Sequence, residues 1–367
     1  MNNRLNRLYQ LMNSKHMDGL VINPGPTLTY LTGLKFHLME RPVVLLLAPP
    51  AEPVLVLPQL EMAKVTQARF PMKACSYGDN PASWVESFRE GVKIAGINGK
   101  KIGVEPNRLR FLELRFLQEA APQSLWLSGE EVFSDLRITK DVEEIQAMRI
   151  AVQLAQSALV ETIKLIQIGM TEQEIASELT LQLLRAGSDS EFPFSPIVAA
   201  GPNSANPHAS PTDRRLIPGD LLVIDWGAAH GGYISDLTRT FAVGEVNSEF
   251  QKIALIVEQA NAAGREAGKP GIPAGEVDKA AREVITAEGY GEYFIHRTGH
   301  GIGMEGHESP YIFGENGQKL VEGMAYTVEP GIYLPDRGGV RIEDNLVVTS
   351  TGCETLSDLP RKLLTVG

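Results

Sequence analysis

The chain has 367 residues, 43% of them hydrophobic, and a formal net charge of −11. This length is enough for two ordinary domains. Because acidic residues predominate and no block of lysine and arginine occurs, the chain lacks the electrostatic footprint of a protein that binds nucleic acid or an anionic membrane, and we expect neither as a partner.

Cysteine usage and hydropathy indicate the compartment. Cys75 and Cys353 lie far apart in the sequence, so they provide neither a disulfide framework nor the close thiolate spacing of a structural zinc site. The first 19 residues carry apolar residues at helical spacing, unlike the continuous apolar core of a signal peptide, and no stretch approaches about 18 uninterrupted apolar residues. We therefore expect a cytoplasmic protein that is neither exported nor membrane-spanning.

The first 135 residues or so alternate short apolar runs with amphipathic segments, a pattern that predicts an α/β domain. The expected strands are 19–22, 43–48, 54–57 and 101–104, and the expected helices are 5–17, 59–68, 81–95 and 107–120.

A long helical pattern then runs from Asp141 to about residue 168. Thr139 is the expected N-cap, and Glu143 and Glu144 fall in the first turn, where the helix dipole favours negative charge. We place the domain boundary here and predict domains at 1–135 and 136–367.

The second domain contains an internal repeat. Two sets of residues recur, the first displaced by 102 positions and the second by 104: Gly169, Glu174, Ile175 and Gly187 match Gly271, Glu276, Val277 and Gly289, while Leu216, Gly219 and Asp225 match Leu320, Gly323 and Glu329. Chance matches among common residues are the alternative explanation. We interpret the pattern as two related halves, each bringing a strand that ends in an acid to a shared cleft.

Two aspartates lie on a predicted hairpin. The apolar segment 221–225 ends at Asp225, a Gly231-Gly232 turn follows, and Asp236 lies in the returning segment. A single aspartate at a strand end is more often an exposed turn residue. Paired strands, however, bring these two carboxylates together, and close carboxylates repel each other unless a proton or a cation lies between them. The hairpin therefore favours a metal site.

A glycine-rich segment, 297–310, surrounds His300 and His307 with four glycines. Glycine permits positive φ and close backbone approach, which suits a loop or bulged strand around a ligand, and histidine is the commonest neutral metal ligand. A glycine-rich surface turn with incidental histidines is the alternative. A dinucleotide or phosphate loop is excluded, because the glycine spacing is wrong and no lysine followed by serine or threonine is present.

Two further acids lie near the C-terminus. Glu329 ends the strand-like segment 324–329, and Glu343 follows in 339–345. Strand alternation places Arg341 on the same face as Glu343. From there Arg341 either orients a ligand carboxylate or forms a plain cross-strand ion pair, and both alternatives remain open.

Together the five candidate ligands are Asp225, Asp236, His300, Glu329 and Glu343. Four carboxylates and one imidazole carry too much negative charge for a single divalent ion, but they suit two ions about 3.5–4 Å apart with bridging carboxylates. The oxygen-rich set favours Mn²⁺, with Co²⁺, Fe²⁺ and Zn²⁺ as alternatives.

The motifs IDWGAAHGGYISDLTRTF, TGHGIGMEGHE, VEPGIY and VRIEDN resemble those of the pita-bread metallopeptidases, a family that includes Xaa-Pro dipeptidase (prolidase), aminopeptidase P, methionine aminopeptidase and creatinase. The resemblance extends over residues 140–360. It implies an α/β N-terminal domain followed by an α+β pita-bread catalytic domain with an internal pseudo-two-fold repeat. The complete ligand set disfavours creatinase, and the preceding domain together with Arg341 favours the proline-specific branch.

The same resemblance implies a mechanism. A water or hydroxide bridging the two metals would attack the scissile carbonyl, with Glu329 as the ligand that also shuttles the proton. His208, in the loop 198–209, matches the first non-ligand histidine of the family, which binds the substrate and stabilises the tetrahedral intermediate. His307 matches the second, beside the scissile carbonyl or the proline. We expect no catalytic role for His296.

The chain departs from the family at Tyr311. Many prolidases carry an arginine here, which holds the free carboxylate of the dipeptide, and a tyrosine does not replace a bidentate charged fork. Tyr311 therefore remains a candidate for substrate binding of a weaker kind. We expect Arg41 or His37, in the segment 34–42, to reach the substrate from the N-terminal domain, across a homodimer as in related enzymes.

The leading interpretation is a Xaa-Pro dipeptidase that acts on short peptides with proline at the second position. The alternative is an Xaa-Pro aminopeptidase, similar to aminopeptidase P, that acts on longer peptides. A binding protein or a non-peptidase on the same fold is less favoured. Such relatives usually lose ligands, and clustered unpaired carboxylates would destabilise a scaffold that has no metal.

Overall fold

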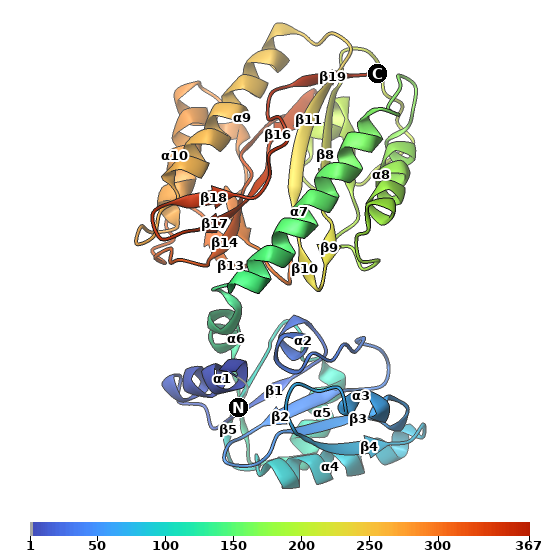
Figure 1. Ribbon diagram of the computed structural model, residues 1–367, viewed down its shortest axis with the longest axis vertical. Helices are drawn as coiled ribbons and strands as arrows, with labels where there is room; N and C mark the ends of the chain where they lie inside the picture. The colour runs from blue at the N-terminus through green and yellow to red at the C-terminus, as the bar shows by residue number, and fades with distance from the viewer. Residues whose placement is uncertain (1–2) are drawn as a thin grey trace. The chain divides into compact units, whose positions relative to one another are not determined.

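The computed structural model describes residues 3–367 and divides into two compact units, Met1–Arg137 and Ile138–Gly367. Figure 1 shows both units. None of the helices among the described residues has the length and apolar character needed to cross a membrane.

The first unit is built on a mixed six-stranded sheet in the order β4-β3-β2-β1-β5-β6. Its strands are β1 (Gly19–Ile22), β2 (Val44–Leu47), β3 (Val54–Pro58), β4 (Lys73–Tyr77), β5 (Lys101–Val104) and β6 (Leu125–Ser128). Its helices are α1 (Asn3–Ser14), α2 (Pro26–Thr32), α3 (Met62–Val65), α4 (Trp84–Ala95), α5 (Phe111–Ala120) and α6 (Glu130–Arg137). The predicted α/β domain is therefore present.

The strands and helices that were not predicted, or were predicted too long, are short or weakly buried. β6 has no fully buried residue, and β4 has only two, so neither shows the continuous apolar run that marked the central strands. The helix expected over 59–68 is reduced to a 3₁₀ turn and the four residues of α3. Leu60 and Met62 are exposed there, so no apolar face packs against the sheet to stabilise a longer helix.

The second unit begins with α7 (Val142–Ile163), and its N-cap is Asp141. The Asp141 side chain accepts a hydrogen bond from the backbone N–H of Glu144, and the Glu144 side chain accepts one from Asp141, which together form a capping box. The prediction of Thr139 as the cap was wrong, because Thr139 pairs with Met324 in an isolated β-bridge.

Two sheets form the middle of this unit. One has the order β19-β11-β8-β7, the other β13-β12-β14-β17-β18, and two short hairpins complete them, β9-β10 and β15-β16. The strands are β7 (Ile197–Ala200), β8 (Leu221–Trp226), β9 (Ala229–His230), β10 (Tyr233–Ile234), β11 (Leu237–Val243), β12 (Gly299–Gly301), β13 (Glu308–Ile312), β14 (Ala325–Val328), β15 (Gly331–Leu334), β16 (Gly338–Arg341), β17 (Asp344–Val348), β18 (Cys353–Thr355) and β19 (Leu364–Val366).

Four helices cover the two sheets (Figure 1). α7 and α8 (Glu172–Ala186) bury one core against the first sheet, in which Leu179, Ile224 and Trp226 pack together. α9 (Ser248–Ala267) and α10 (Gly275–Ala287) bury another, in which Val257 and Ile285 meet the β15-β16 hairpin. These helices pack against the sheets and fix the positions of β8 and β14.

The internal repeat is present in the backbone. Gly169 and Gly271 have φ of 93° and 89°, in the left-handed region that favours glycine. Each donates its N–H to the carbonyl of the matching leucine, Leu216 at 2.9 Å and Leu320 at 2.7 Å. The equivalent strands β8 and β14 lead directly to the two acids of the repeat, at the same end of each half.

The two sheets meet at a junction made of site residues. Thr238 and Glu343 form an isolated antiparallel bridge between the sheets. Next to it, the backbone N–H of Asp236 donates to the Asn345 side chain at 3.0 Å, and that side chain donates back to the Asp236 carbonyl at 2.5 Å. This double hydrogen bond fixes Asp236 beside Glu343.

Asp344 reinforces the same junction. Its fully buried carboxylate accepts hydrogen bonds from Arg239 of β11 at 2.8 Å and from Arg361 of the C-terminal segment, also at 2.8 Å. Ser357 donates a further one at 2.6 Å. Because both the acid and Arg239 are withdrawn from water, removing one partner leaves a buried charge without compensation.

We predict that Asp344→Asn lowers the free energy of unfolding of the second unit by about 3–5 kcal/mol. The measurement is urea unfolding of metal-free protein followed by Trp226 fluorescence, with Trp84 and Trp126 replaced by phenylalanine. Glu354→Gln, which breaks the half-exposed ion pair with Arg149, is the matched control and should cost less than about 1 kcal/mol. Equal costs for the two variants would contradict this account of the junction.

Candidate metal centre

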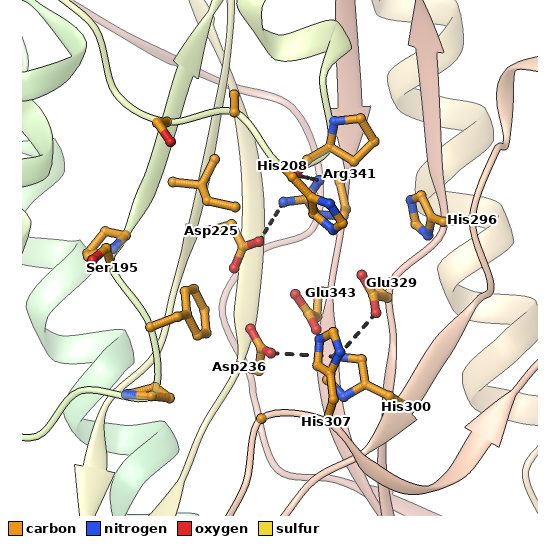
Figure 2. Close-up of a pocket in the computed structure, with 18 of the residues that line it drawn as sticks. Ser195, His208, Asp225, Asp236, His296, His300, His307, Glu329, Arg341 and Glu343 are labelled. Atoms are coloured by element: carbon orange, nitrogen blue, oxygen red, sulfur yellow. Dashed lines mark hydrogen bonds and ion pairs between the residues drawn. The ribbon is translucent and has the colours of Figure 1, made fainter. Parts of the chain in front are cut away.

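A cavity of about 730 Å³ opens where the two sheets meet, and all of its lining residues belong to the second unit. Phe194, Ile197 and Pro211 contribute an apolar wall. The polar part contains all five candidate ligands, whose carboxylates and ring face one another in Figure 2. Residues spread over more than a hundred positions of sequence therefore converge on one space.

Asp225 and Asp236 come from the paired strands β8 and β11. The pairing places Thr238 opposite Asp225, and Asp236 lies just before β11, two positions from Thr238 and on the same face. The short β9-β10 hairpin with its Gly231-Gly232 turn makes the connection, as the sequence predicted. Both aspartates are buried.

His300 lies in the middle of β12, between β13 and β14. Its glycine neighbours are required by close approach: a Cβ on Gly299 would lie 1.9 Å from the Thr327 carbonyl oxygen, and one on Gly301 would lie 2.2 Å from that of Ser309. The register shifts between the two glycines, so this is the bulged strand that the glycine spacing suggested.

The imidazole of His300 has one nitrogen held and the other directed into the site. Nδ1 donates to the Gly301 carbonyl at 3.1 Å, so Nε2 keeps its lone pair. Nε2 lies 3.3 Å from Glu329 Oε1 and 3.7 Å from Asp236 Oδ2. A neutral ring with its free nitrogen among carboxylates is the form in which histidine binds a metal.

Glu329 and Glu343 lie at the two ends of the β15-β16 hairpin. The backbone N–H of Glu329 donates to the Thr298 carbonyl at 2.8 Å, which joins this acid to the His300 strand. Glu343 Oε2 accepts a hydrogen bond from the Thr238 hydroxyl at 2.8 Å. The hairpin thus returns the chain so that both glutamates line the same cavity.

The close packing of buried carboxylates in this cavity is electrostatically unfavourable. Burial raises the pKa of Asp236 and Glu343 well above the ordinary values, and the neighbouring acids raise both further. Burial likewise raises the pKa of Glu329 to about 8 and lowers that of His300 to about 3. Protonated carboxyl groups of Asp236, Glu329 and Glu343 are therefore favoured at neutral pH unless cations replace those protons, whereas the His300 ring stays neutral.

The residues fit divalent metal ions. Ligand atoms of Asp236, His300 and Glu343 all lie within 4.8 Å of one another. Two buried carboxylate oxygens in the cavity, Asp225 Oδ1 and Glu343 Oε1, have no hydrogen-bond partner. Buried oxygens without donors are costly, whereas oxygens offered to a cation are satisfied. Asp225 and Glu329 lie beside this cluster and complete the donor set.

Arg341, which strand alternation placed on the face of Glu343, contacts the carboxylate of another candidate ligand, Asp225. Its guanidinium donates to Asp225 Oδ2 at 2.5 Å and to the Thr238 hydroxyl at 3.1 Å, and not to Glu343 itself. It also donates to the Pro207 carbonyl at 3.2 Å, next to His208. The arginine therefore orients Asp225 directly and Glu343 through Thr238.

Both predicted non-ligand histidines line the cavity from exposed positions. His208 follows the turn of Asn206, whose side chain accepts a hydrogen bond from the His208 backbone at 3.1 Å. The His307 ring packs against the His300 ring, with 4.0 Å between their centroids. Figure 2 shows His208 and His307 at opposite ends of the ligand group.

Sequence reasoning missed His296 and Arg297, which also line the cavity. The His296 ring accepts a hydrogen bond from the Tyr333 hydroxyl at 2.8 Å and donates to the Arg297 carbonyl at 2.7 Å. Both ring nitrogens of His296 are therefore engaged by the protein, and the expectation that this histidine has no catalytic role stays a prediction. Its position just before the glycine-rich segment was the one available signal.

Three predicted substrate-binding residues lie elsewhere. Tyr311 belongs to β13, beneath the Arg297 side chain, and is not part of the cavity lining. Arg41 and His37 belong to the first unit, where Arg41 forms ion pairs with Glu40 and Asp79 at 3.2 and 3.1 Å. That Arg41 or His37 reaches a substrate stays a prediction.

Comparison with known proteins covers both units. The model of metallopeptidase family M24 matches residues 146–350, and that of the creatinase/prolidase N-terminal domain matches residues 4–139. A probable dipeptidase of Mycobacterium tuberculosis is 37% identical over 356 residues, covering 95% of this chain and 92% of the relative. A Xaa-Pro dipeptidase of Lactobacillus helveticus is 35% identical over 360 residues, 98% of both chains.

Solved structures agree with these sequence matches. A dipeptidase of Pyrococcus horikoshii superposes with a TM-score of 0.93 at 37% identity, covering 99% of this chain and 100% of that one. An X-Pro aminopeptidase of Thermotoga maritima superposes with a TM-score of 0.86 at 30% identity, covering 100% of both. The whole chain therefore shares its fold with enzymes of both kinds.

We predict that adding Mn²⁺ to chelator-treated protein raises its melting temperature, because a ligand at about 100 times its Kd stabilises the native state by about 2.7 kcal/mol. Asp236→Asn should lose most of this rise and leave the metal-free melting temperature nearly unchanged, since burial raises the pKa of Asp236 and favours its neutral form without metal. The exposed Asp213→Asn is the matched control and should keep the full rise. Equal rises in both variants would contradict the placement of the metal site.

Proposed function

Because the chain belongs to metallopeptidase family M24 and carries the creatinase/prolidase N-terminal domain, we propose that it is a Xaa-Pro dipeptidase, an enzyme that hydrolyses the bond between any residue and a C-terminal proline. The observation that carries the proposal is the convergence of four carboxylates and one imidazole on one cavity, with two buried oxygens left unpartnered. Full-length similarity to Xaa-Pro dipeptidases supports the substrate.

We propose that Asp225, Asp236, His300, Glu329 and Glu343 hold two divalent ions, Mn²⁺ in preference to Co²⁺, Fe²⁺ or Zn²⁺. Bound ions of this kind supply a nucleophilic water at neutral pH and polarise the scissile carbonyl. Two divalent ions would neutralise four ionised carboxylates, whereas a single divalent ion would neutralise only two of them. The raised pKa of Asp236 and of Glu343 supports this count, since each reflects burial among other negative charges.

The remaining side chains would handle the substrate. Glu329 lies next to His300, and we assign to its carboxylate the transfer of the proton from the attacking water to the leaving proline nitrogen. His208 would donate a hydrogen bond to the oxyanion that develops on the scissile carbonyl. His307 would contact the proline side of the bond. The apolar wall of Phe194 and Ile197 offers space for the side chain before proline.

Two further proposals concern the state of the enzyme. We propose a homodimer, as the resemblance to related peptidases implied, and a cytoplasmic location. Two distant cysteines, which the structure leaves as free thiols, suit a reducing compartment.

A second candidate function is Xaa-Pro aminopeptidase activity on longer peptides. The observation that favours it is Tyr311, which stands where the resemblance implies an arginine for the free carboxylate of a dipeptide. The similarity in fold to an X-Pro aminopeptidase is consistent with the same activity. The two functions differ in whether the substrate may continue beyond proline.

We predict that the Mn²⁺-loaded protein cleaves Ala-Pro with a kcat/KM at least tenfold above that for Ala-Pro-Ala, because the dipeptide carboxylate contributes a charge-assisted contact of about 1.5–3 kcal/mol. Release of alanine, followed for both peptides with each of the four candidate metals, is the measurement. Comparable values for the two peptides would favour the aminopeptidase. Failure to cleave either peptide with any of the metals would refute the peptidase assignment.

A further inference from the structure

Arg297 is a cation in the wall of the metal-site cavity, and it forms no ion pair with any carboxylate that the structure describes. The half-buried side chain contacts the Nδ1 atom of His307 at 3.3 Å and the ring of Tyr311. Within residues 3–367 no carboxylate lies within ion-pair distance of its guanidinium. An arginine that is held in a cavity without a counter-ion is a ready receptor for a ligand carboxylate.

The other arginine of the cavity is not available for this purpose. Arg341 is 3% exposed, and its donors are occupied by Asp225, Thr238, Pro207 and Tyr333. The two arginines of the lining therefore have different tasks. Arg341 pairs directly with Asp225, whereas Arg297 forms no ion pair with any described carboxylate and lines the space that a ligand enters.

Stacking holds the Arg297 guanidinium in place. The Tyr311 ring lies under it, with 4.4 Å between the guanidinium carbon and the ring centroid. A guanidinium packed over a ring is desolvated on that face, while the N–H groups at its edge stay free to donate in their plane. The resemblance implied an arginine at position 311. Here Tyr311 supplies no charge itself, but its ring supports the charged guanidinium of Arg297.

The position along the site fits the end of a dipeptide. Arg297 contacts His307, and the His307 ring packs on His300 at the metal centre, so the cation lies one side chain beyond the ligand group. The carboxylate of a C-terminal proline lies one residue beyond the scissile carbonyl, a span of about 3.8 Å along the chain. A cation one side chain beyond the metal ligands is therefore placed to bind the carboxylate of the C-terminal proline.

We propose that Arg297, held by Tyr311, binds the C-terminal carboxylate of the substrate and so makes this enzyme select dipeptides, in the place of Arg41 or His37. This inference rests on the proposed Xaa-Pro hydrolysis. It adds the residue that distinguishes a dipeptide from a longer peptide. A peptide that continues beyond proline presents a neutral amide here, which leaves the Arg297 charge unpaired in the cavity.

The test compares Arg297→Met with the wild type on Ala-Pro and on its C-terminal amide, both with Mn²⁺ present. Methionine keeps the unbranched stem and removes the charge. We expect kcat/KM for Ala-Pro to fall about 10- to 100-fold, mainly through KM, and the ratio of free acid to amide to fall by the same factor. Loss of the His307 contact would affect both substrates alike, so the ratio isolates the carboxylate.

Matched variants sharpen the result. Arg297→Lys, which keeps the charge without the planar fork, should retain part of the ratio. The double variant Arg297→Met/Tyr311→Arg returns a cation to the same place and should recover part of it. Arg115→Met removes an arginine that is stacked on Phe116 in the first unit, and should leave the ratio at the wild-type value.

Three outcomes would overturn the inference. In the first, Arg297→Met lowers kcat/KM equally for the acid and the amide. In the second, Arg41→Ala lowers the ratio and Arg297→Met does not, which would return the role to the N-terminal domain. In the third, Arg297→Met impairs only Asp-Pro and leaves Ala-Pro unchanged, which would assign the arginine to the side chain before proline. If the wild type cleaves neither Ala-Pro nor its amide, it is the proposed function itself that fails.

Discussion

Mutual repulsion among buried carboxylates is the constraint on which this structure depends. Asp225, Asp236, Glu329 and Glu343 are brought together by two sheets, and burial among like charges raises the pKa of Asp236, Glu329 and Glu343. Other contacts at the junction of the two sheets offset this unfavourable free energy. They are the double hydrogen bond between Asp236 and Asn345 and the hydrogen bonds of Asp344 with Arg239 and Arg361. The architecture supplies rigidity, and divalent cations would supply the missing positive charge.

The internal repeat explains how two of the acids reach the same place. Gly169 and Gly271 adopt the same left-handed turn, and β8 and β14 then lead to Asp225 and Glu329. A pair of related halves facing each other delivers one acid from each side. The other ligands have no such equivalence: Asp236 lies between β10 and β11, Glu343 lies between β16 and β17, and His300 lies within the glycine-flanked strand β12.

The positions of the central strands and the family could be predicted from the sequence because both depend on local patterns. Apolar runs marked β1, β3 and β5, and the ligand motifs identified the family, which the comparisons confirm. The N-cap of α7 was misplaced because Thr139 is held by a distant strand, which no local pattern reports. That Arg297 and His296 line the cavity was not predicted for the same reason: their positions depend on Tyr311 and Tyr333, which follow later in the chain.

The two arginines of the cavity show how environment separates residues of one type. The donors of Arg341 are occupied by other groups of the protein, since it orients Asp225 directly and Glu343 through Thr238. Arg297 is left facing the space that a substrate would enter. The most direct test of the central claim is anomalous diffraction at the manganese edge from crystals grown with Mn²⁺. The account predicts two peaks about 3.5–4 Å apart among the five ligands. A single peak, or peaks outside this cavity, would contradict it.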